Sequence, residues 1–460
     1  MATRTTHTIQ IHALDAEGRG VGYLPDESGD ASGKVVFVEG ALPKETVAAE
    51  SWKKKSRWEL ATAVSILKAS PLRVPPKCPY FGKCGGCSMQ HLEPSAQVAV
   101  KQRVLEDNLQ HIGKVKAESI LPPIHGPYWG YRFRARLSVN HVPKKGGILV
   151  GFREKQSRYI TDMTQCPVLP PHMSALLVPL RELIGSLSIY SQVPQIEVAI
   201  GHDGNRPVTA LLLRIMATLS QDDETRLKQF ANKHDVQWWL QTKGPDTVRP
   251  FYPLENRLQY VLPEFGVTMP FKPGDFTQVN YHINQVLVSR ALRLLGIQPD
   301  DRVADLFCGL GNFSLPIARR AKEVVGIEGS AVLTRRAQEN AVLNGLQEKT
   351  TFRERNLFEM TVEEWKTLKP FDRILIDPPR DGAMALCQTL ADIPDEDAQY
   401  RPERIVYVSC NPATLARDAG ILVNSGRYRL LQAGVVNMFP HTSHVESMAV
   451  FEVTPEKSKC

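Results

Sequence analysis

Apolar runs and segments of helical periodicity alternate between residue 266 and residue 460. Predicted strands lie at 302–307, 323–327, 350–354, 371–376 and 404–409, most of them apolar, and the helical segments lie at 281–295, 313–320 and 330–344. Strands that alternate with helices in this way are typical of a parallel sheet with helices on both faces. The pattern therefore predicts an α/β domain with a doubly wound, Rossmann-like sheet over residues 266–460.

The first part of the chain, residues 1–67, has short strand-like stretches separated by Gly-rich turns. Closely spaced strands of this kind predict a small all-β, OB-like barrel. Trp52 and Trp58 flank a cluster of four basic residues there. Such a surface could bind single-stranded nucleic acid by stacking and charge. A solvated hairpin with half-buried Trp side chains explains the same pattern equally well.

Residues 68–265 mix strands and helices and predict an α+β central domain. A helix is predicted over about 96–112, where apolar residues recur at helical spacing, and it could pack on the carboxyl-terminal domain. Arg132, Arg134 and Arg136 alternate with apolar residues, which predicts a strand with one basic face. That face could contact phosphates, although a solvated face is the more common explanation.

Charge and hydropathy narrow the class of protein. The net charge of +7 mildly favours a polyanionic partner, and a generic basic surface explains it about as well. No apolar run is long enough to span a bilayer, and the first residues lack the apolar core of a signal peptide. We therefore expect a cytoplasmic protein with no membrane contact, and the pattern indicates no obligate protein partner.

Four cysteines form a candidate metal site. Cys78, Cys84 and Cys87 are separated by five and two residues, and Cys166 is the obvious fourth ligand. In a cytosolic protein such cysteines are more often metal ligands than disulfides. Four thiolates suit structural zinc or an iron–sulfur cluster, and the spacing alone slightly favours zinc.

A Gly-rich turn follows the predicted strand that ends near Asp305 and is a candidate cofactor loop. Glu328 ends the next strand, where an acid can accept hydrogen bonds from ribose hydroxyls. Ser314 stands where the dinucleotide fingerprint has its third glycine, which weakens a nicotinamide interpretation. An adenosyl cofactor without a pyrophosphate, such as S-adenosylmethionine, fits better.

Cys410 follows another apolar strand and precedes a turn that opens a helix. A helix start lowers a thiol pKa, so we expect a reactive thiolate. Asp377 ends a neighbouring strand, and Glu446 opens a later one as a candidate base. A thiolate that adds to carbon 6 of a pyrimidine activates carbon 5 for a methyl group, and a base then removes the carbon-5 proton. Alternatively, Cys410 is a buried packing residue and Glu446 a solvated acid.

Together these motifs resemble the RNA (uracil-5-)-methyltransferase family. The resemblance covers nearly the whole chain and rests on the following segments: Phe276 to Asn280, Asp305 to Phe313, Asp377 to Arg380, Ser409 to Thr414 and His444 to Met448. Residues 36–47 resemble a TRAM domain, an RNA-binding barrel. That barrel and the four cysteines resemble the subgroup that methylates 23S ribosomal RNA.

The resemblance implies a role for each matching residue. It makes Cys410 the nucleophile and Glu446 the base, and it implies a [4Fe-4S] cluster, with zinc less favoured, on Cys78, Cys84, Cys87 and Cys166. The residues that it implies for S-adenosylmethionine are Gln278, Phe307, Asn312, Glu328, Asn356 and Asp377.

The function expected from the sequence is therefore methylation of a uridine at carbon 5 in 23S rRNA. Methylation of tRNA uracil or of RNA cytosine is the enzymatic alternative, and an RNA-binding iron–sulfur scaffold is the alternative without catalysis. RNA cytosine-5 methyltransferases typically carry a cysteine after the Asp-x-Pro of the equivalent loop, whereas Arg380 stands here. The target base must lie in a loop or leave its stack, because pairing hides carbon 6.

Overall fold

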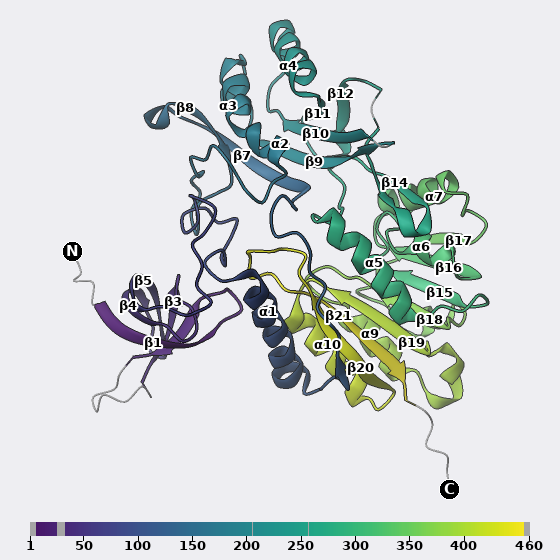
Figure 1. The fold of residues 1–460 in the computed structure, drawn as a ribbon. Coiled ribbons are helices and arrows are strands. Elements are labelled where there is room, and N and C mark those ends of the chain that lie inside the picture. The colour runs from purple at the N-terminus through teal and green to yellow at the C-terminus, as the bar shows by residue number, and fades with distance from the viewer. Residues whose placement is uncertain (1–5, 25–32, 205, 256, 455–460) are drawn as a thin grey trace.

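The chain folds into a small barrel and two larger sheets (Figure 1). The computed structural model describes residues 6–24, 33–204, 206–255 and 257–454. Within these ranges, the helices are all too short or too polar to cross a membrane.

The amino-terminal barrel closes in the strand order β1-β2-β3-β5-β4. Alternate residues along its strands face inward, and Ile9, Ile11, Val36 and Val47 are buried in its core. This period of two is the reason that the segment forms strands. The barrel expected from the sequence is confirmed. Its strands are β1 (Thr6–Leu14), β2 (Gly20–Tyr23), β3 (Val35–Glu39), β4 (Thr46–Lys54) and β5 (Trp58–Lys68).

The central sheet has the order β12-β11-β10-β9-β13-β14, with β7 pairing β8 and β9. Its helices α3 and α4 pack on one face around the buried Trp238. The strands are β7 (Arg134–Val142), β8 (Gly147–Gly151), β9 (Gln195–Asp203), β10 (Arg206–Arg214), β11 (Val236–Gln241), β12 (Arg249–Tyr252), β13 (Gln259–Leu262) and β14 (Val267–Pro270). The helices are α2 (Pro171–Ala175), α3 (Leu177–Ser186) and α4 (Gln221–His234), with short turns at 143–145, 190–192, 245–247 and 263–265.

The carboxyl-terminal sheet has the order β17-β16-β15-β18-β19-β21-β20-β6. From β15 the chain builds outward to β17, then returns to the other side of β15 with β18 and β19. The strands are β15 (Arg302–Leu306), β16 (Glu323–Glu328), β17 (Thr350–Glu354), β18 (Arg373–Ile376), β19 (Arg404–Ser409), β20 (Tyr428–Val436) and β21 (Glu446–Val453). The helices are α5 (Tyr281–Leu295), α6 (Ser314–Ala318), α7 (Ala331–Leu343), α8 (Val362–Lys366), α9 (Met384–Asp392) and α10 (Pro412–Asn424), with a short turn at 395–400.

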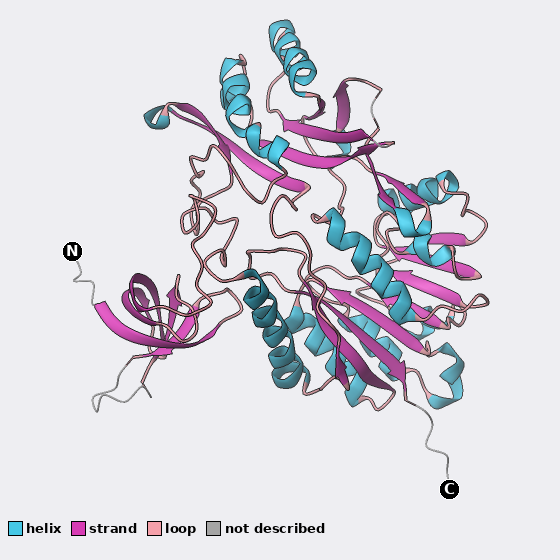
Figure 2. Ribbon diagram, viewed as in Figure 1, coloured by secondary structure: helices cyan, strands magenta, loops and turns pink. Residues whose placement is uncertain are grey.

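Successive residues of these strands enter two different cores, one on each face of the sheet. Val303 and Leu375 pack with α5 and α6, whereas Ala304 and Ile374 pack with α9 and α10. Strands buried on both faces read as continuous apolar runs, which is the pattern seen in the sequence. The helices on the two sides are visible in Figure 2. The doubly wound α/β fold expected from the sequence is confirmed.

Two segments from the amino-terminal half join this sheet. The helix α1 (Pro94–Asn108), extended by a π-helical turn (Leu109–Gly113), packs against α10 and β20. The short strand β6 (Ser119–Ile120) pairs with β20 in parallel at the sheet edge. Figure 1 shows α1 lying along the carboxyl-terminal domain. The last part of the sheet therefore contains residues that lie some 300 positions earlier in the sequence.

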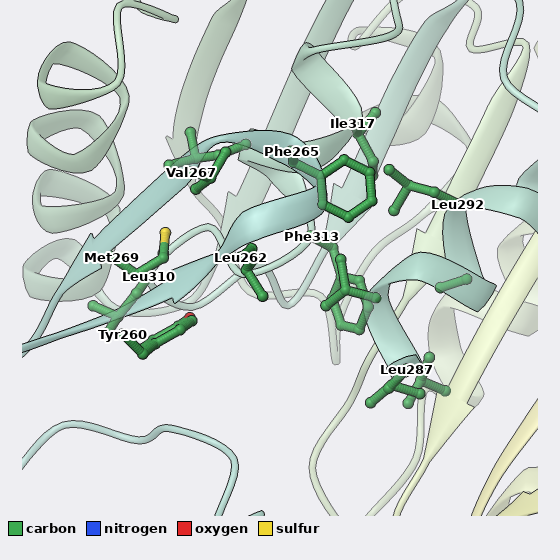
Figure 3. Packing of buried hydrophobic residues seen from close by; sticks show 14 of the residues in the cluster. Tyr260, Leu262, Phe265, Val267, Met269, Leu287, Leu292, Leu310, Phe313 and Ile317 are labelled. Carbon is green, nitrogen blue, oxygen red and sulfur yellow. The ribbon is translucent and has the colours of Figure 1, made fainter. Parts of the chain in front are cut away.

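The hairpin β13–β14 connects the central sheet to the core around α5. Tyr260, Leu262 and Met269 pack in one cluster with Leu287 and Phe313 (Figure 3). The loop that leaves β14 then leads directly into α5. This packing fixes the start of that loop against the carboxyl-terminal domain.

Candidate active site

The carboxyl ends of four parallel strands meet at one edge of the sheet. Phe307 follows β15, Glu328 ends β16, Asp377 follows β18 and Cys410 follows β19. The strand order changes direction next to β15, and ligands of open α/β sheets bind at such a point. The four residues that the sequence placed after separate strands therefore share one edge.

The antiparallel strand β21 brings Glu446 to Cys410. Ser409 in β19 lies opposite Ser447 in β21. Because the strands are antiparallel, the next residue of β19 and the preceding residue of β21 face each other across the same gap. Both side chains are only partly buried. A thiol and a carboxyl group thus lie side by side at an accessible edge.

Hydrogen bonds hold the turn that carries Cys410. Asn411 caps α10, and its side-chain oxygen accepts a hydrogen bond from the Ala413 amide at 3.1 Å. The Asn411 side-chain amide and the Thr414 hydroxyl both donate to the carbonyl oxygen of Arg380, at 3.0 and 3.2 Å. The loop after β18 is therefore bonded to the turn after β19.

Burial and neighbouring acids shape the charges at this edge. Burial, and then the charge of Asp377, raise the pKa of Glu446 to about 8. Burial, and then Asp305, raise the pKa of Asp377 to about 7. Burial, and then Glu446 and Asp377, raise the pKa of the Cys410 thiol to about 11. The expectation that the helix start lowers this thiol pKa is therefore wrong in the free protein. Arg380 is the nearby cation that lowers the pKa of both Cys410 and Glu446.

The Gly-rich loop after β15 opens onto free space. Phe307 adopts a left-handed φ of 64°, which strains a residue with a side chain. Gly309 has a φ of 55°, and no atom lies within 4 Å of where a Cβ would stand. The Glu328 carboxylate accepts hydrogen bonds from the backbone amides of Gly309 and Ser330, both at 3.1 Å. Glu328 thus fixes the loop as well as standing at its rim.

Asp305 lies beneath this loop, and the Ser314 hydroxyl donates to one of its oxygens. The other Asp305 oxygen is buried without a hydrogen-bond partner in the described part of the chain. Burial raises the pKa of Asp305 to about 7. Ser314, which replaces the third fingerprint glycine, thus has a polar partner of its own.

Asn312 and Gln278 lie around a second group of polar side chains. The Asn312 side-chain oxygen accepts hydrogen bonds from the Tyr260 hydroxyl at 2.9 Å and from the Asn284 amide at 3.0 Å. Gln278 lines a small cavity with the same Tyr260 and Asn284. Asn356 lies on the exposed loop after β17, where its side-chain oxygen accepts a hydrogen bond from the Phe358 amide at 3.1 Å. The Phe358 ring in turn lies 5.5 Å from the Phe307 ring, so this loop borders the Gly-rich loop.

The strand predicted to show a basic face places Arg134 in contact with a neighbouring loop instead of with solvent. Arg134 donates to the carbonyl oxygen of Pro273 at 2.6 Å and to the Thr277 hydroxyl at 3.2 Å. It therefore fastens the loop that carries Gln278. Arg136 pairs with Glu197 at 3.0 Å and remains largely exposed.

The four predicted cluster cysteines line one cavity of about 60 Å³. Cys78, Cys84 and Cys166 are buried, and Cys87 is partly buried. Burial, and then the other thiols, raise the pKa of Cys87 to about 12. Arg132 lines the same cavity, and its buried Nε has no hydrogen-bond partner among the described residues. Within the same residues, no three acidic, His or Cys side chains are grouped tightly enough to hold a single metal ion.

Sequence reasoning missed two kinds of residue at this edge. Asp305 and Arg380 belong to the motifs, but their charges matter only because the fold brings the strand ends together. Lys101 on α1 is buried and its charge interacts with Glu446. Its spacing of four residues before Leu105 placed it on the buried face of the predicted helix. A lysine at a buried helical position is the signal that could have marked it.

Known proteins resemble this chain over nearly its whole length. The family described as tRNA (Uracil-5-)-methyltransferase matches residues 267–453. A Cupriavidus pinatubonensis protein named 23S rRNA (uracil(1939)-C(5))-methyltransferase RlmD is 60% identical over 444 residues, which are 96% of this chain and 95% of that protein. The chain belongs to the RNA (uracil-5-)-methyltransferase family. A Burkholderia thailandensis protein of the same name is also 60% identical, over 98% of this chain and 96% of its own length.

A solved structure has the same fold as nearly the whole of this chain. The Pyrococcus abyssi tRNA (uracil-54, C5)-methyltransferase, in complex with S-adenosyl-L-homocysteine, matches with a TM-score of 0.70 and 23% identity. The match covers 96% of this chain and all of that one. This match shows the fold that the sequence predicted. The relatives that are 60% identical show that the chain is a methyltransferase that depends on S-adenosylmethionine.

Proposed function

We propose that this enzyme methylates carbon 5 of a uridine in 23S rRNA through a covalent bond between Cys410 and carbon 6. The observation that carries the proposal is the strand register that sets Cys410 beside Glu446. A nucleophile and a base are the two groups that the carbon-5 chemistry needs, and here they share one accessible edge. The names of the close relatives supply the 23S rRNA substrate.

The side chains act on the pyrimidine in a defined order. The Cys410 thiolate forms a bond to carbon 6, and the electrons of the C5–C6 double bond move into an enolate. Once carbon 5 carries the methyl group, the Glu446 carboxylate accepts the carbon-5 proton. The electron pair of that C–H bond rebuilds the double bond and expels the thiolate. Arg380, which favours the ionised forms of both side chains, supports each step.

The residues around the Gly-rich loop fit S-adenosylmethionine. One buried oxygen of Asp305 has no hydrogen-bond partner among the residues that the structure describes, and the space at Gly309 is open, so the loop has room and polar capacity for a ligand. When bound, this cofactor supplies a methyl group on a positively charged sulfur. We propose that it is held by Gln278, Phe307, Asn312, Glu328, Asn356 and Asp377. The acids among them, Glu328 and Asp377, also provide negative charge on that edge.

The cysteine cavity fits an iron–sulfur cluster. The four thiols line one cavity together with Arg132, whose buried Nε has no hydrogen-bond partner within the described residues. We propose that Cys78, Cys84, Cys87 and Cys166 bind a [4Fe-4S] cluster, whose thiolate ligands Arg132 would balance in charge. Four iron and four sulfide per chain in the purified protein are expected, and one zinc without iron would contradict it.

We propose that the amino-terminal barrel binds the RNA and that the protein acts in the cytoplasm. Trp52 is exposed, and the Lys53 ammonium lies 5.7 Å from the centre of the Trp58 ring. Aromatic rings next to basic groups suit unstacked bases and phosphates. The uridine itself must leave its stack to reach Cys410, because a paired base hides carbon 6.

The test is methyl transfer from labelled S-adenosylmethionine to separate 23S rRNA and tRNA transcripts, followed by mapping of the modified base. We expect 5-methyluridine in the 23S transcript and little label in tRNA. Label confined to tRNA would reassign the substrate, and label on cytosine would reassign the base.

A further inference from the structure

A buried lysine reaches the loop between β20 and β21. Lys101 on α1 is 1% exposed, although lysine is rarely fully buried. Its Nζ donates to the side-chain oxygen of Asn437 and to the carbonyl oxygen of Phe439, both at 2.8 Å. Burying an ammonium group is costly unless it is paired, so a position of this kind requires a specific reason.

The attachment lies next to Glu446. Val436, the last residue of β20, pairs with Glu446, the first residue of β21. Asn437 follows Val436 directly, so Lys101 binds the loop next to the residue pair that contains Glu446. The two charges interact: Glu446 raises the pKa of Lys101 against the stronger effect of burial, and Lys101 lowers that of Glu446.

The other groups that face Glu446 do not replace this cation. Asp377 raises the pKa of Glu446, and the facing Cys410 thiol brings no positive charge. Arg380 lowers the pKa of Glu446 more than Lys101 does, but it lies on an exposed loop and no hydrogen bond among the described residues ties its side chain to the segment that leads to Glu446.

Two histidines on the loop between β20 and β21 also interact with Lys101. Burial lowers the pKa of His441 to about 4 and also lowers the pKa of His444, so both are neutral near pH 7. Burial lowers the pKa of Lys101 itself to about 7, although Glu446 opposes this effect. Among the groups facing Glu446, Lys101 is therefore the buried one that carries positive charge at and below about pH 7.

We propose that Lys101 is a positioning residue for the catalytic base. Its ammonium fixes the loop that ends at Glu446 and favours the carboxylate that accepts the carbon-5 proton. The inference rests on the proposed function, since it requires Glu446 to act as the base. It assigns to α1, a helix far from the methyltransferase motifs in the sequence, a direct influence on the proton-transfer step.

The test compares Lys101→Met with Gln102→Met in the intact, cluster-containing enzyme. The Gln102 side-chain oxygen accepts a hydrogen bond from the Val435 amide at 3.2 Å, so the control removes a contact between the same helix and β20 without removing a charge. Single-turnover methylation and the fraction of covalently bound RNA are measured from pH 6 to 9.5. Thermal melting reports the fold of each variant.

Lys101→Met is expected to move the acid limb of the pH–rate profile upward by about one pH unit, because the carboxylate loses its cation. At pH 6.5, where Lys101 is mostly charged, the covalent adduct should accumulate severalfold, since formation continues while proton removal slows. Gln102→Met is expected to unfold at a lower temperature than the wild-type enzyme, with the acid limb of its pH–rate profile unchanged. Lys101→Gln, which keeps a hydrogen-bond donor, is expected to shift the limb as Lys101→Met does and serves if the latter fails to fold.

The inference would be overturned if folded Lys101 variants kept the acid limb of the pH–rate profile and the adduct level of the wild-type enzyme. An equal shift of that limb in Gln102→Met would also overturn it. These outcomes are distinct from failure of the proposed function. That failure would appear as the absence of any adduct in both the wild-type enzyme and Glu446→Gln.

Discussion

Replacing Glu446 by Gln should make the folded protein more stable while it blocks turnover. Burial raises the pKa of Glu446 from its ordinary value of 4.5 to about 8. Between these values the folded chain retains a proton that the unfolded chain has released. The stability of the wild-type protein therefore falls as the pH rises from about 4.5 to about 8, and this contribution is level above that. Glutamine has the same shape and does not titrate.

The size of the effect follows from the shift. One pKa unit corresponds to about 1.4 kcal/mol, so the wild-type carboxyl group lowers the free energy of unfolding by at most about 5 kcal/mol above pH 8. At pH 7 the limit is about 3 kcal/mol, because most of the group is still protonated. Both figures are upper limits, since water reaches part of the side chain.

The assay is urea or thermal unfolding of both proteins at pH 5, 7 and 8.5. The stability advantage of Glu446→Gln is expected to be small at pH 5 and to grow toward pH 8.5. Glu452 on the same strand is the matched control, because hydrogen bonds first from Arg404 and then from Arg429 lower its pKa. Because the stabilisation from a lowered carboxyl pKa is fully present above about pH 4.5, Glu452→Gln should be less stable than the wild-type protein by a similar amount at all three pH values. An advantage of Glu446→Gln that does not change with pH, or a loss like that of Glu452→Gln, would refute the reasoning.

Three further outcomes follow from the site. Cys410→Ala should abolish both turnover and the RNA adduct seen on a denaturing gel. Full activity of this variant would contradict the assignment of Cys410 as the nucleophile. Cys166→Ala should lose bound iron, measured by metal analysis and visible absorbance, and unchanged iron content would exclude this ligand. Arg134→Met should weaken S-adenosylmethionine binding in calorimetry about tenfold, because Arg134 fastens the loop that carries Gln278. The exposed Arg136→Met is the control, and equal weakening there would contradict that role.

The parallel sheet could be predicted from the sequence because its signals are local. Apolar runs such as 302–307 and 404–409 coincide with β15 and β19, and the helix predicted over 281–295 is α5. The rule that parallel strands end at one edge then brings Asp377 and Cys410 together. Most of the candidate site follows from motif order and this rule.

The features of the site that the sequence could not predict depend on contacts between residues far apart in the chain. The Cys410 pKa follows from the packing of Glu446 and Asp377 around it, which a helix start in the sequence does not reveal. The internal role of Arg134 depends on a loop more than a hundred residues later. The pairing of β6 with β20 joins residues 313 positions apart, and no local pattern specifies such a partner.

The central claim is that Cys410 bonds to the pyrimidine, and the most direct measurement is mass spectrometry of Glu446→Gln incubated with the RNA and S-adenosylmethionine. After digestion, the account predicts that the peptide containing Cys410 carries a uridine nucleotide with one added methyl group. Methylated RNA released at the normal rate with no nucleotide on that peptide, or a nucleotide attached to another cysteine, would contradict it.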